Sequence, residues 1–549
     1  MALTDVDRSS GSTLSRADLL RLSGAAGLGV ALPGALARTA GAAVSGPAAP
    51  SREIAQLTWA LSSTPRSLDF IHSFDLATPT IMALALESLM QFGPDLRIRP
   101  NLARSVGRPD PVTYVYKLRS GVKFWDGSPL TADDVVFSMN KHLDPKAGSE
   151  LASYYSSVKW IRATRPDEVT IKLKSPDATF QYIPAFFTAL VVKKQFWQDH
   201  AKNIGTPGVL TMGTGPYRIV EYVPDESVRL ERNESYWGAR PALKSLVIKF
   251  IPEAPTRLLA MRSGGIDGAF EVPPDQIQQW RSISDAKVTE APSLQTEFFE
   301  FDLLQKPFGD IHVRRAFAHA LDTRGLVNAL LRGHGAAATS IVPPVAWSGL
   351  LTAGQTKALY ASLQKYPFDL AKAKRELAQS SAPNGFKATY NFPDSFPEMG
   401  KAALSLAENL KQLNVTLDVK QQPFNQWLAE NRAHGRFGLG PGIWFMDYLD
   451  PANILDLFLN SKFAVKNGLN NASYKNPTVD RLLNLQKSAT SSTARARALS
   501  QVQRIASTDL PYLPLWYPSI AMAVRKKYVY RNFGPLYIYQ PWARYISTA

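Results

Sequence analysis

The sequence predicts an α/β fold that carries a small additional β-rich region, and three stretches support this prediction. In residues 112–119 two sets of side chains alternate with the period of a β-strand: Tyr114, Tyr116 and Leu118 against Thr113, Val115 and Lys117. Residues 246–269 run from a strand, 246–251, through a helix, 256–262, that Gly264-Gly265 ends, to a short second strand, which is the order of a β-α-β unit. Residues 401–420 give another helix followed by a strand. Strands that alternate with helices in this way are typical of α/β proteins.

The first 37 residues have the layout of a signal peptide. A basic segment, 15–22, precedes a short apolar run, 23–37, that ends in small residues. The run is too short and too rich in glycine to span a membrane. The layout resembles a twin-arginine signal, although Ala17 stands where the second arginine is expected. We therefore expect a signal peptide over 1–37 and an Ala-, Gly-, Pro- and Ser-rich linker over 38–52.

The mature chain begins with a strand at 56–61 and an apolar helical stretch at 80–90. In the β-rich region that follows, Thr131-Ala-Asp-Asp134 predicts a capping box at the start of a helix. Gly213-Thr-Gly-Pro-Tyr217 opens a predicted hairpin of strands 217–223 and 227–231.

The second half of the chain also alternates predicted helices and strands. A helix is expected where four apolar residues fall on one face: Val313, Phe317, Ala320 and Leu321. A further helix is expected near 494–506, followed by a buried strand at 511–516 that is bounded by prolines.

The length, net charge and cysteine content of the chain exclude several classes of function. A chain of 549 residues exceeds the size of one growing core, so two or more domains are expected. The net charge of +16 is spread thinly, without the clustering that nucleic-acid binding needs, so we expect no nucleic-acid partner. The absence of cysteine excludes disulfides, cysteine-ligated metals and cysteine nucleophiles.

Motifs for catalysis and for cofactors are not found. The seven histidines are scattered and form no H-E-x-x-H zinc site, and no G-x-S-x-G elbow or phosphate-binding loop is present. We therefore expect no catalytic residue, no metal and no cofactor. A hydrolase remains an alternative, because a catalytic triad is assembled in space and not along the sequence.

The candidate site is the stretch from Gly440 to Asn453, where an apolar run ends in Asp447. Three aromatic residues surround this carboxylate in sequence: Trp444, Phe445 and Tyr448. A cation that reaches such a carboxylate gains a charge-assisted hydrogen bond and an aromatic ring face. The structural alternative is that Asp447 caps a helix through Asp450-Pro451 and that the aromatic residues belong to the core. Asp450 is then a cap or turn residue ahead of Pro451. The residues alone leave both open.

Four blocks, taken in order, resemble the extracytoplasmic solute-binding proteins of peptide ABC transporters, family 5 (cluster C). They are 114–138, 213–217 with 230–238, 307–317 with 320–322, and Trp444-Phe-Met-Asp-Tyr-Leu-Asp-Pro451. In peptide-binding members the aspartate of the W-x-x-D motif holds the peptide's α-ammonium group. Carried to this chain, the resemblance assigns that role to Asp447, with Trp444 beside it.

The resemblance implies a periplasmic binding protein-like fold of two lobes joined by a hinge, which close on the ligand. The expected limits are as follows: 53–88, first part of lobe 1; 89–205, its small β-rich subdomain; 206–291, second part of lobe 1; 292–512, lobe 2; and 513–549, the C-terminal part of lobe 1.

The function implied by the resemblance is capture of a short peptide, or a similar amine-bearing solute, for an ABC permease of the inner membrane. We expect a monomer that is not an enzyme and that is soluble in the periplasm, since the chain lacks the cysteine of lipoprotein members. Two alternatives stay open: an exported peptide or ester hydrolase, and a carrier of the same family for an opine, a sugar derivative or a metal chelate.

Overall fold

The computed structural model describes residues 52–549 except 73–74, 94 and 436. The predicted signal peptide, and the predicted linker up to residue 51, lie outside the described residues. Within them, no helix combines the length and the apolar character needed to cross a membrane.

A mixed sheet of twelve strands is the framework of the described chain. Its strands are, in spatial order, β16 (Thr416–Gln422), β15 (Lys387–Pro393), β17 (Leu439–Phe445), β13 (Gln295–Phe301), β18 (Tyr512–Arg525), β11 (Gly268–Ala269), β1 (Ile54–Leu61), β10 (Leu243–Phe250), β9 (Ser227–Arg232) and β8 (Tyr217–Val223), while β12 (Ala286–Pro292) and β14 (Gly335–Ala337) also pair with β18. We refer to the part around β1 and β8–β12, together with the β-rich region that lies between β1 and β8 in the chain, as lobe 1 and to the part around β13–β17 as lobe 2.

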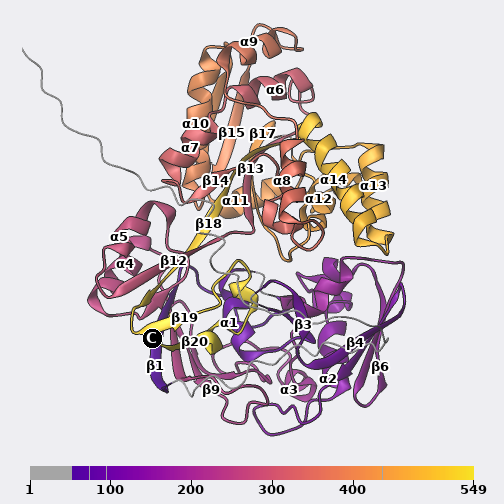
Figure 1. The fold of residues 1–549 in the computed structure, drawn as a ribbon, viewed down its shortest axis with the longest axis vertical. Helices are drawn as coiled ribbons and strands as arrows, with labels where there is room; N and C mark the ends of the chain where they lie inside the picture. Colours follow the sequence, from indigo (N-terminus) through magenta and orange to yellow (C-terminus); the bar gives the residue numbers. More distant parts are fainter. Residues whose placement is uncertain (1–51, 73–74, 94, 436) are drawn as a thin grey trace, which may run out of the picture. The chain divides into compact units, whose positions relative to one another are not determined.

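The chain passes between the lobes along two extended segments (Figure 1). The first leads from β12 through Ser293 and Leu294 into β13. The second is β18, whose residues 512–516 pair with β13 and whose residues 519–525 pair with β12. Because β18 is shared, the lobes are connected by hydrogen-bonded strands.

Lobe 1 carries short helices around its half of the sheet: α1 (Ala77–Ala85), α3 (Lys194–Asp199), α4 (Ala254–Ser263) and α5 (Ile277–Arg281). Its C-terminal end forms the hairpin β19 (Tyr528–Tyr530) and β20 (Ile546–Thr548). The predicted helix over 256–262 is confirmed as α4, and Gly264 ends it with a φ of 85°, in the left-handed region that glycine adopts readily.

The predicted β-rich region forms a separate four-stranded sheet in the order β4 (Ala103–Asp110), β5 (Thr113–Leu118), β7 (Glu168–Leu173), β6 (Val158–Arg165), with the small pair β2 (Met90–Phe92) and β3 (Ile98–Pro100) beside it. Helix α2 (Ala132–Asn140) begins with the capping box predicted at Thr131 and Asp134.

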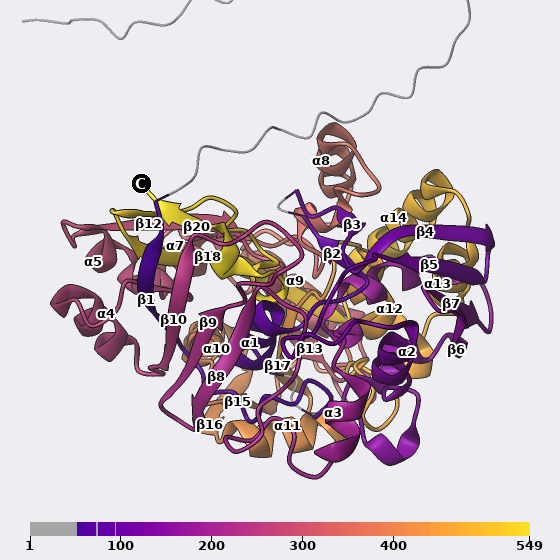
Figure 2. The same cartoon turned by 90° about the horizontal axis from the view of Figure 1, so that it is seen from below.

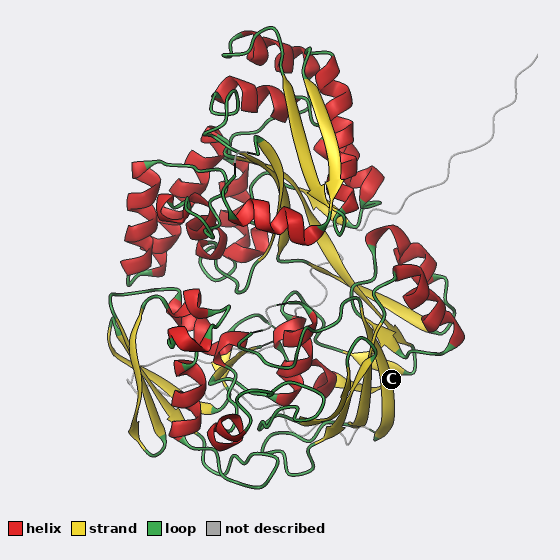
Figure 3. Cartoon of the chain, turned by 180° about the vertical axis from the view of Figure 1, so that it is seen from behind, coloured by secondary structure: helices red, strands yellow, loops and turns green. Residues whose placement is uncertain are grey.

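Lobe 2 holds most of the helical structure, and Figure 3 shows these helices packed around its strands: α6 (Ile311–His319), α7 (Thr323–Leu330), α8 (Ala353–Ala361), α9 (Leu370–Ala378), α10 (Pro397–Lys411), α11 (Phe424–Arg432), α12 (Ala452–Leu459), α13 (Pro477–Ser488) and α14 (Ser492–Asp509). The four apolar residues predicted to share a helix face are buried, but α6 ends at His319, so Ala320 and Leu321 lie beyond it. The predicted α/β class is confirmed.

One hydrophobic cluster joins the β-rich region to lobe 2. Residues of β5, β6 and β7 share it with residues of α12, α13 and α14, and Figure 2 shows these elements side by side. The residue limits expected for the lobes stay a prediction, but this shared core fixes where the two lobes meet.

The helix expected over 80–90 is wrong in its limits, because α1 ends at Ala85. The carbonyl of Ala85 accepts the N–H of Gly215, and the Glu87 side chain turns inward to accept three donors: Thr214 Oγ1, Tyr236 OH and Trp237 Nε1. These contacts also explain the Gly-Thr-Gly motif, since a Cβ on Gly215 would lie 2.5 Å from the Ala85 oxygen. Tertiary hydrogen bonds thus override the local helical pattern.

Candidate functional site

Asp447 lies in the loop between β17 and α12. Strand β17 pairs with β13 through Phe445, and the N–H of Met446 continues to the carbonyl of Leu294. Pro451 then stands immediately before the first residue of α12. Asp447 therefore follows the end of β17, beside the first passage of the chain between the lobes. Asp447 is only 2% exposed.

Both lobes hold the carboxylate of Asp447. The hydroxyl of Tyr154, from the β-rich region, donates to Oδ2 at 2.6 Å, and Nδ2 of Asn453, from α12, donates to the same oxygen at 3.1 Å. Trp444 Nε1 donates to Oδ1 of Asn453 at 3.0 Å, which fixes the orientation of that amide. Among the described residues, Oδ1 of Asp447 is left without a side-chain donor.

Burial raises the pKa of Asp447 to about 6, against the opposing effect of the hydrogen bonds from Tyr154 and Asn453. Burial and the adjacent carboxylate raise the pKa of Tyr154, so its hydroxyl remains a donor. None of the described contacts of Asp447 comes from a cation. At neutral pH this site therefore holds a buried negative charge that lacks a countercharge from the described part of the chain.

The predicted aromatic neighbours take different positions. Trp444 packs edge-on against Phe458, with ring centroids 5.4 Å apart. Phe445 is half-buried and contacts both the cluster that joins the lobes and the core of lobe 1. Tyr448 stacks on Tyr182 at 4.7 Å and is nearly buried. Their roles as ligand contacts stay predictions.

Tyr154 and Asn453 are the polar partners that the sequence did not single out. Tyr154 is 293 residues from Asp447 in the chain, so no sequence spacing could connect them. Asn453 closed the candidate stretch, but an asparagine at a helix start reads first as a cap. Further rings extend from Tyr154, which lies 5.3 Å from Phe186, and Phe186 lies 4.6 Å from Tyr539.

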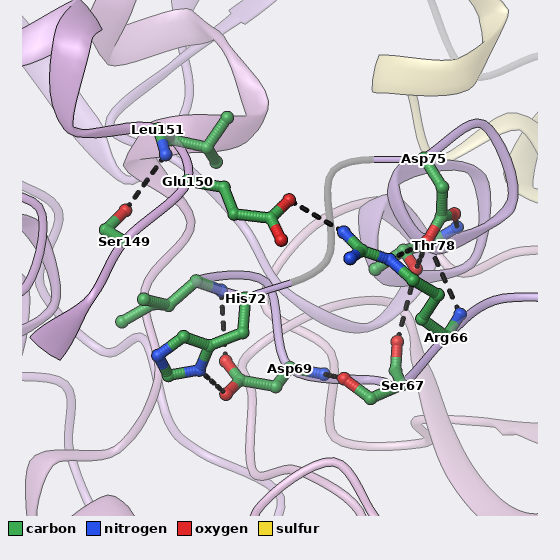
Figure 4. Close-up of polar contacts among 10 residues, drawn as sticks. Arg66, Ser67, Asp69, His72, Asp75, Thr78, Ser149, Glu150 and Leu151 are labelled. Atoms are coloured by element: carbon green, nitrogen blue, oxygen red, sulfur yellow. Dashed lines mark hydrogen bonds and ion pairs between the residues drawn. The ribbon is translucent and has the colours of Figure 1, made fainter. Parts of the chain in front are cut away.

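A polar network in lobe 1 positions the segment that carries Tyr154 (Figure 4). Arg66 donates to Glu150 at 2.7 Å and lies 4.0 Å from Asp75. Asp69 contacts the His72 ring at 2.5 Å, and the N–H of Glu150 reaches the carbonyl of Ile71. Because Glu150 stands four residues before Tyr154, these bonds tie the Tyr154 segment to the loop after β1.

Asp450 is not the simple cap or turn residue that the sequence suggested. Its Oδ1 does accept the N–H of Ala452 at 2.9 Å, as a cap does. However, the residue is fully buried and pairs with Arg495 through two hydrogen bonds, at 2.8 and 3.1 Å. Tyr182 OH donates to it as well, at 3.2 Å. Asp450 therefore does more than cap α12, because it also neutralises a buried guanidinium.

The side chains around Asp447 also line two cavities. A cavity of about 410 Å³ is lined by Tyr154, Tyr448 and Asn453, together with charged residues of both lobes: Asp177, Asp456, Lys462 and Lys487. A second, of about 210 Å³, lies in lobe 2 and is lined in part by Trp444. Within the described ranges, no group of three metal-ligating side chains is placed to hold a metal ion.

The model of the family "Bacterial extracellular solute-binding proteins, family 5 Middle" matches residues 97–465. Two similar proteins are the heme-binding protein A of Haemophilus influenzae, 28% identical over 80% of this chain and 82% of that protein, and the probable D,D-dipeptide-binding periplasmic protein DdpA of Escherichia coli, 27% identical over 86% and 91%.

Solved structures of the same kind have a similar fold. The periplasmic binding protein DppA from Helicobacter pylori, in complex with the peptide STSA, is 23% identical, with a TM-score of 0.77 over 90% of this chain and 98% of that chain. A dipeptide-binding protein from Pseudoalteromonas, in complex with Met-Leu, is 22% identical, with a TM-score of 0.76 over 90% of this chain and 100% of that chain. The predicted two-lobed binding-protein fold is confirmed.

Proposed function

Because the chain belongs to the bacterial extracellular solute-binding proteins of family 5, we propose that it captures a short peptide or a similar amine-bearing solute between its lobes. In this proposal Asp447 receives the ligand's ammonium group, with Trp444, Phe445 and Tyr448 around it, and the loaded protein delivers the ligand to an ABC permease of the inner membrane. The protein acts as a soluble periplasmic monomer and does not convert its ligand.

The observation that carries the proposal is the buried carboxylate of Asp447 without a countercharge. Isolated buried charges are unfavourable, and proteins pair them or neutralise them. A ligand ammonium would supply both the missing charge and a donor for Oδ1, which the described side chains leave open. Since Tyr154 and Asn453 come from different lobes, such a ligand would also be held by both.

The comparisons support the same class of ligand. The two solved structures are complexes with the peptides STSA and Met-Leu, and the Escherichia coli relative is named for D,D-dipeptides. A second candidate, a non-peptide solute, is favoured by the relative that is named for heme. Free amino groups separate the two candidates, because heme has none to offer to Asp447.

The test uses the mature protein and a pool of short peptides, beside the same pool after N-terminal acetylation. Small-angle scattering is expected to show compaction with the free peptides and none with the acetylated ones, since acetylation removes the ammonium group. Mass spectrometry of the bound fraction is expected to return intact peptide in stoichiometric amount. Equal compaction with both pools would contradict the role of Asp447, and cleaved products would favour the hydrolase.

Affinity for an amine-bearing peptide is expected to depend on the ionisation of Asp447. An α-amino group stays charged below about pH 8, whereas Asp447 becomes protonated as the pH falls through its pKa of about 6. The association constant should therefore fall about tenfold per pH unit below that value. Tyr154→Phe removes a hydrogen bond that lowers this pKa, so the midpoint should move to higher pH.

Calorimetry between pH 4.5 and 8 measures this profile. Tyr155→Phe is the matched control, because the hydroxyl of Tyr155 donates to the carbonyl of Thr188, away from Asp447. A flat profile, or an equal shift in both variants, would show that Asp447 does not control binding.

A further inference from the structure

The smaller cavity in lobe 2 has the features of a separate subsite. It measures about 210 Å³. It lies where β13, β17 and α11 meet. Besides aliphatic residues and glycine, its lining contains a small polar group and an aromatic group: Glu300, Asn431 and Asn471, and Phe396, Phe424, Trp427, Trp444 and Phe458.

The polar group presents acceptors to the cavity. Glu300, on β13, is 1% exposed, and its two carboxylate oxygens accept from Asn471 Nδ2 at 3.3 and 3.2 Å. Asn431 Nδ2 reaches Glu300 Oε2 at 3.3 Å. These bonds are longer than the usual value near 2.9 Å, so they satisfy the carboxylate weakly. Oδ1 of Asn471 is buried and has no partner, which leaves a second acceptor available.

The aromatic group adds ring faces around these acceptors. Phe424 and Trp427, both on α11, lie 5.7 Å apart, and Phe396 lies 6.4 Å from Phe424. Trp444 and Phe458 close the opposite side. A cation near such rings is attracted by their electron-rich faces. Among the described residues that line the cavity, Glu300 is the one that can carry a charge.

This cavity is connected to the Asp447 site through Trp444. The indole ring of Trp444 lines the cavity, while its N–H orients Asn453, which donates to Asp447. Trp444 therefore links the two sites: it lines the cavity that contains Glu300, and it orients the partner of Asp447.

We propose that the cavity binds a lysine- or arginine-like side chain of the ligand, with Glu300 and Asn471 as acceptors for its charged end. The assignment to a side chain rests on the proposed function, since it requires a peptide whose ammonium group is at Asp447. The preference of the cavity for an organic cation does not depend on the proposed function, because this preference follows from Glu300, Asn471 and the rings alone.

The ionisation of Glu300 gives a second readout. Burial raises its pKa to about 8, against the smaller effects of Asn471 and Asn431. The titratable groups that face it are the hydroxyls of Tyr390 on β15 and Tyr512 on β18, whose pKa values burial raises, so both stay neutral. Entry of a cation at pH 7 should therefore ionise Glu300 and release a proton.

The first test uses n-butylguanidinium and, as the uncharged counterpart, 1-butanol, titrated into the mature protein by calorimetry and NMR. Saturable binding is expected for n-butylguanidinium and not for 1-butanol. The binding of the cation should release a proton, which is visible as an enthalpy that depends on the buffer. Glu300→Gln should weaken it at least tenfold and abolish the proton release. Glu430→Gln is the matched control, because Glu430 is an exposed carboxylate on α11, the helix that carries Trp427 and Asn431 of the cavity lining.

The second test compares tripeptides in which one position is lysine, norleucine or glutamate. Lysine at one position should bind at least tenfold more tightly than norleucine, and Glu300→Gln should remove this preference while leaving the norleucine peptide unchanged. If Glu300→Gln disturbs folding, as melting would show, Trp427→Leu removes a ring face of the cavity and should reduce the same preference.

The outcomes separate the two proposals. Tripeptide binding without any preference for lysine, together with equal signals from the cation and butanol, would overturn the subsite and leave the proposed function standing. Binding of butylguanidinium that depends on Glu300, without binding of any peptide, would keep the cation site and refute the peptide function.

Discussion

Asp447→Asn is expected to weaken the binding of an amine-bearing peptide thirtyfold or more. The substitution keeps the size of the side chain and its place between Tyr154 and Asn453, but it removes the charge that an ammonium group would pair with. Truncating one member of a buried, hydrogen-bonded charge pair reduces binding by about 2–5 kcal/mol, and each 1.4 kcal/mol is about a factor of ten. Calorimetry with one peptide at pH 7 measures the change.

The control for this variant is Asp418→Asn. Asp418 is an exposed carboxylate on β16 that pairs with Lys420 at the surface, where ion pairs contribute about 0–1 kcal/mol. It changes the net charge equally and should leave affinity unchanged. If Asp447→Asn binds normally but unfolds at a lower denaturant concentration, Asp447 is a structural residue and the proposed site is wrong.

Asp450→Asn is expected to lower the free energy of unfolding by about 3–5 kcal/mol, because it leaves the buried guanidinium of Arg495 without its countercharge. The loss should exceed by far the roughly 1 kcal/mol expected for a helix cap alone. Urea unfolding of the variant and of the wild-type protein measures the difference.

The double variant Asp450→Leu with Arg495→Met tests the cause. It removes both charges from the same buried position, so it should recover part of the stability that the single variant loses. A loss of about 1 kcal/mol in Asp450→Asn would mean that the cap accounts for the role of this residue.

Local patterns predicted those parts of the fold that depend on local contacts. The capping box at Thr131, the strand at 113–118 and the glycine end of α4 all follow from bonds within a few residues. The end of α1 was missed because Glu87 is held by donors more than a hundred residues away. No periodicity in the sequence records such a bond.

The same limit applies to the site. The sequence placed Asp447 next to aromatic residues, but it could not distinguish that carboxylate from Asp450, three residues later. What separates them is their partners: Asp450 has Arg495, 45 residues away, while Asp447 has Tyr154 from the other lobe. Glu300 lies in β13, and its partners Asn431 and Asn471 are 131 and 171 residues away, so no local pattern marks it as a site residue.

Strand β18 changes partners within a few residues, and a proline stands at the change. Pro518 lies between the residues that pair with β13 and those that pair with β12, opposite Gly335 of β14. Proline has no N–H, so this point contributes no donor to the ladder, and its fixed φ keeps the backbone extended. Turning one lobe against the other at this residue therefore breaks no hydrogen bond donated by it, so the shared strand can serve as the joint between the lobes.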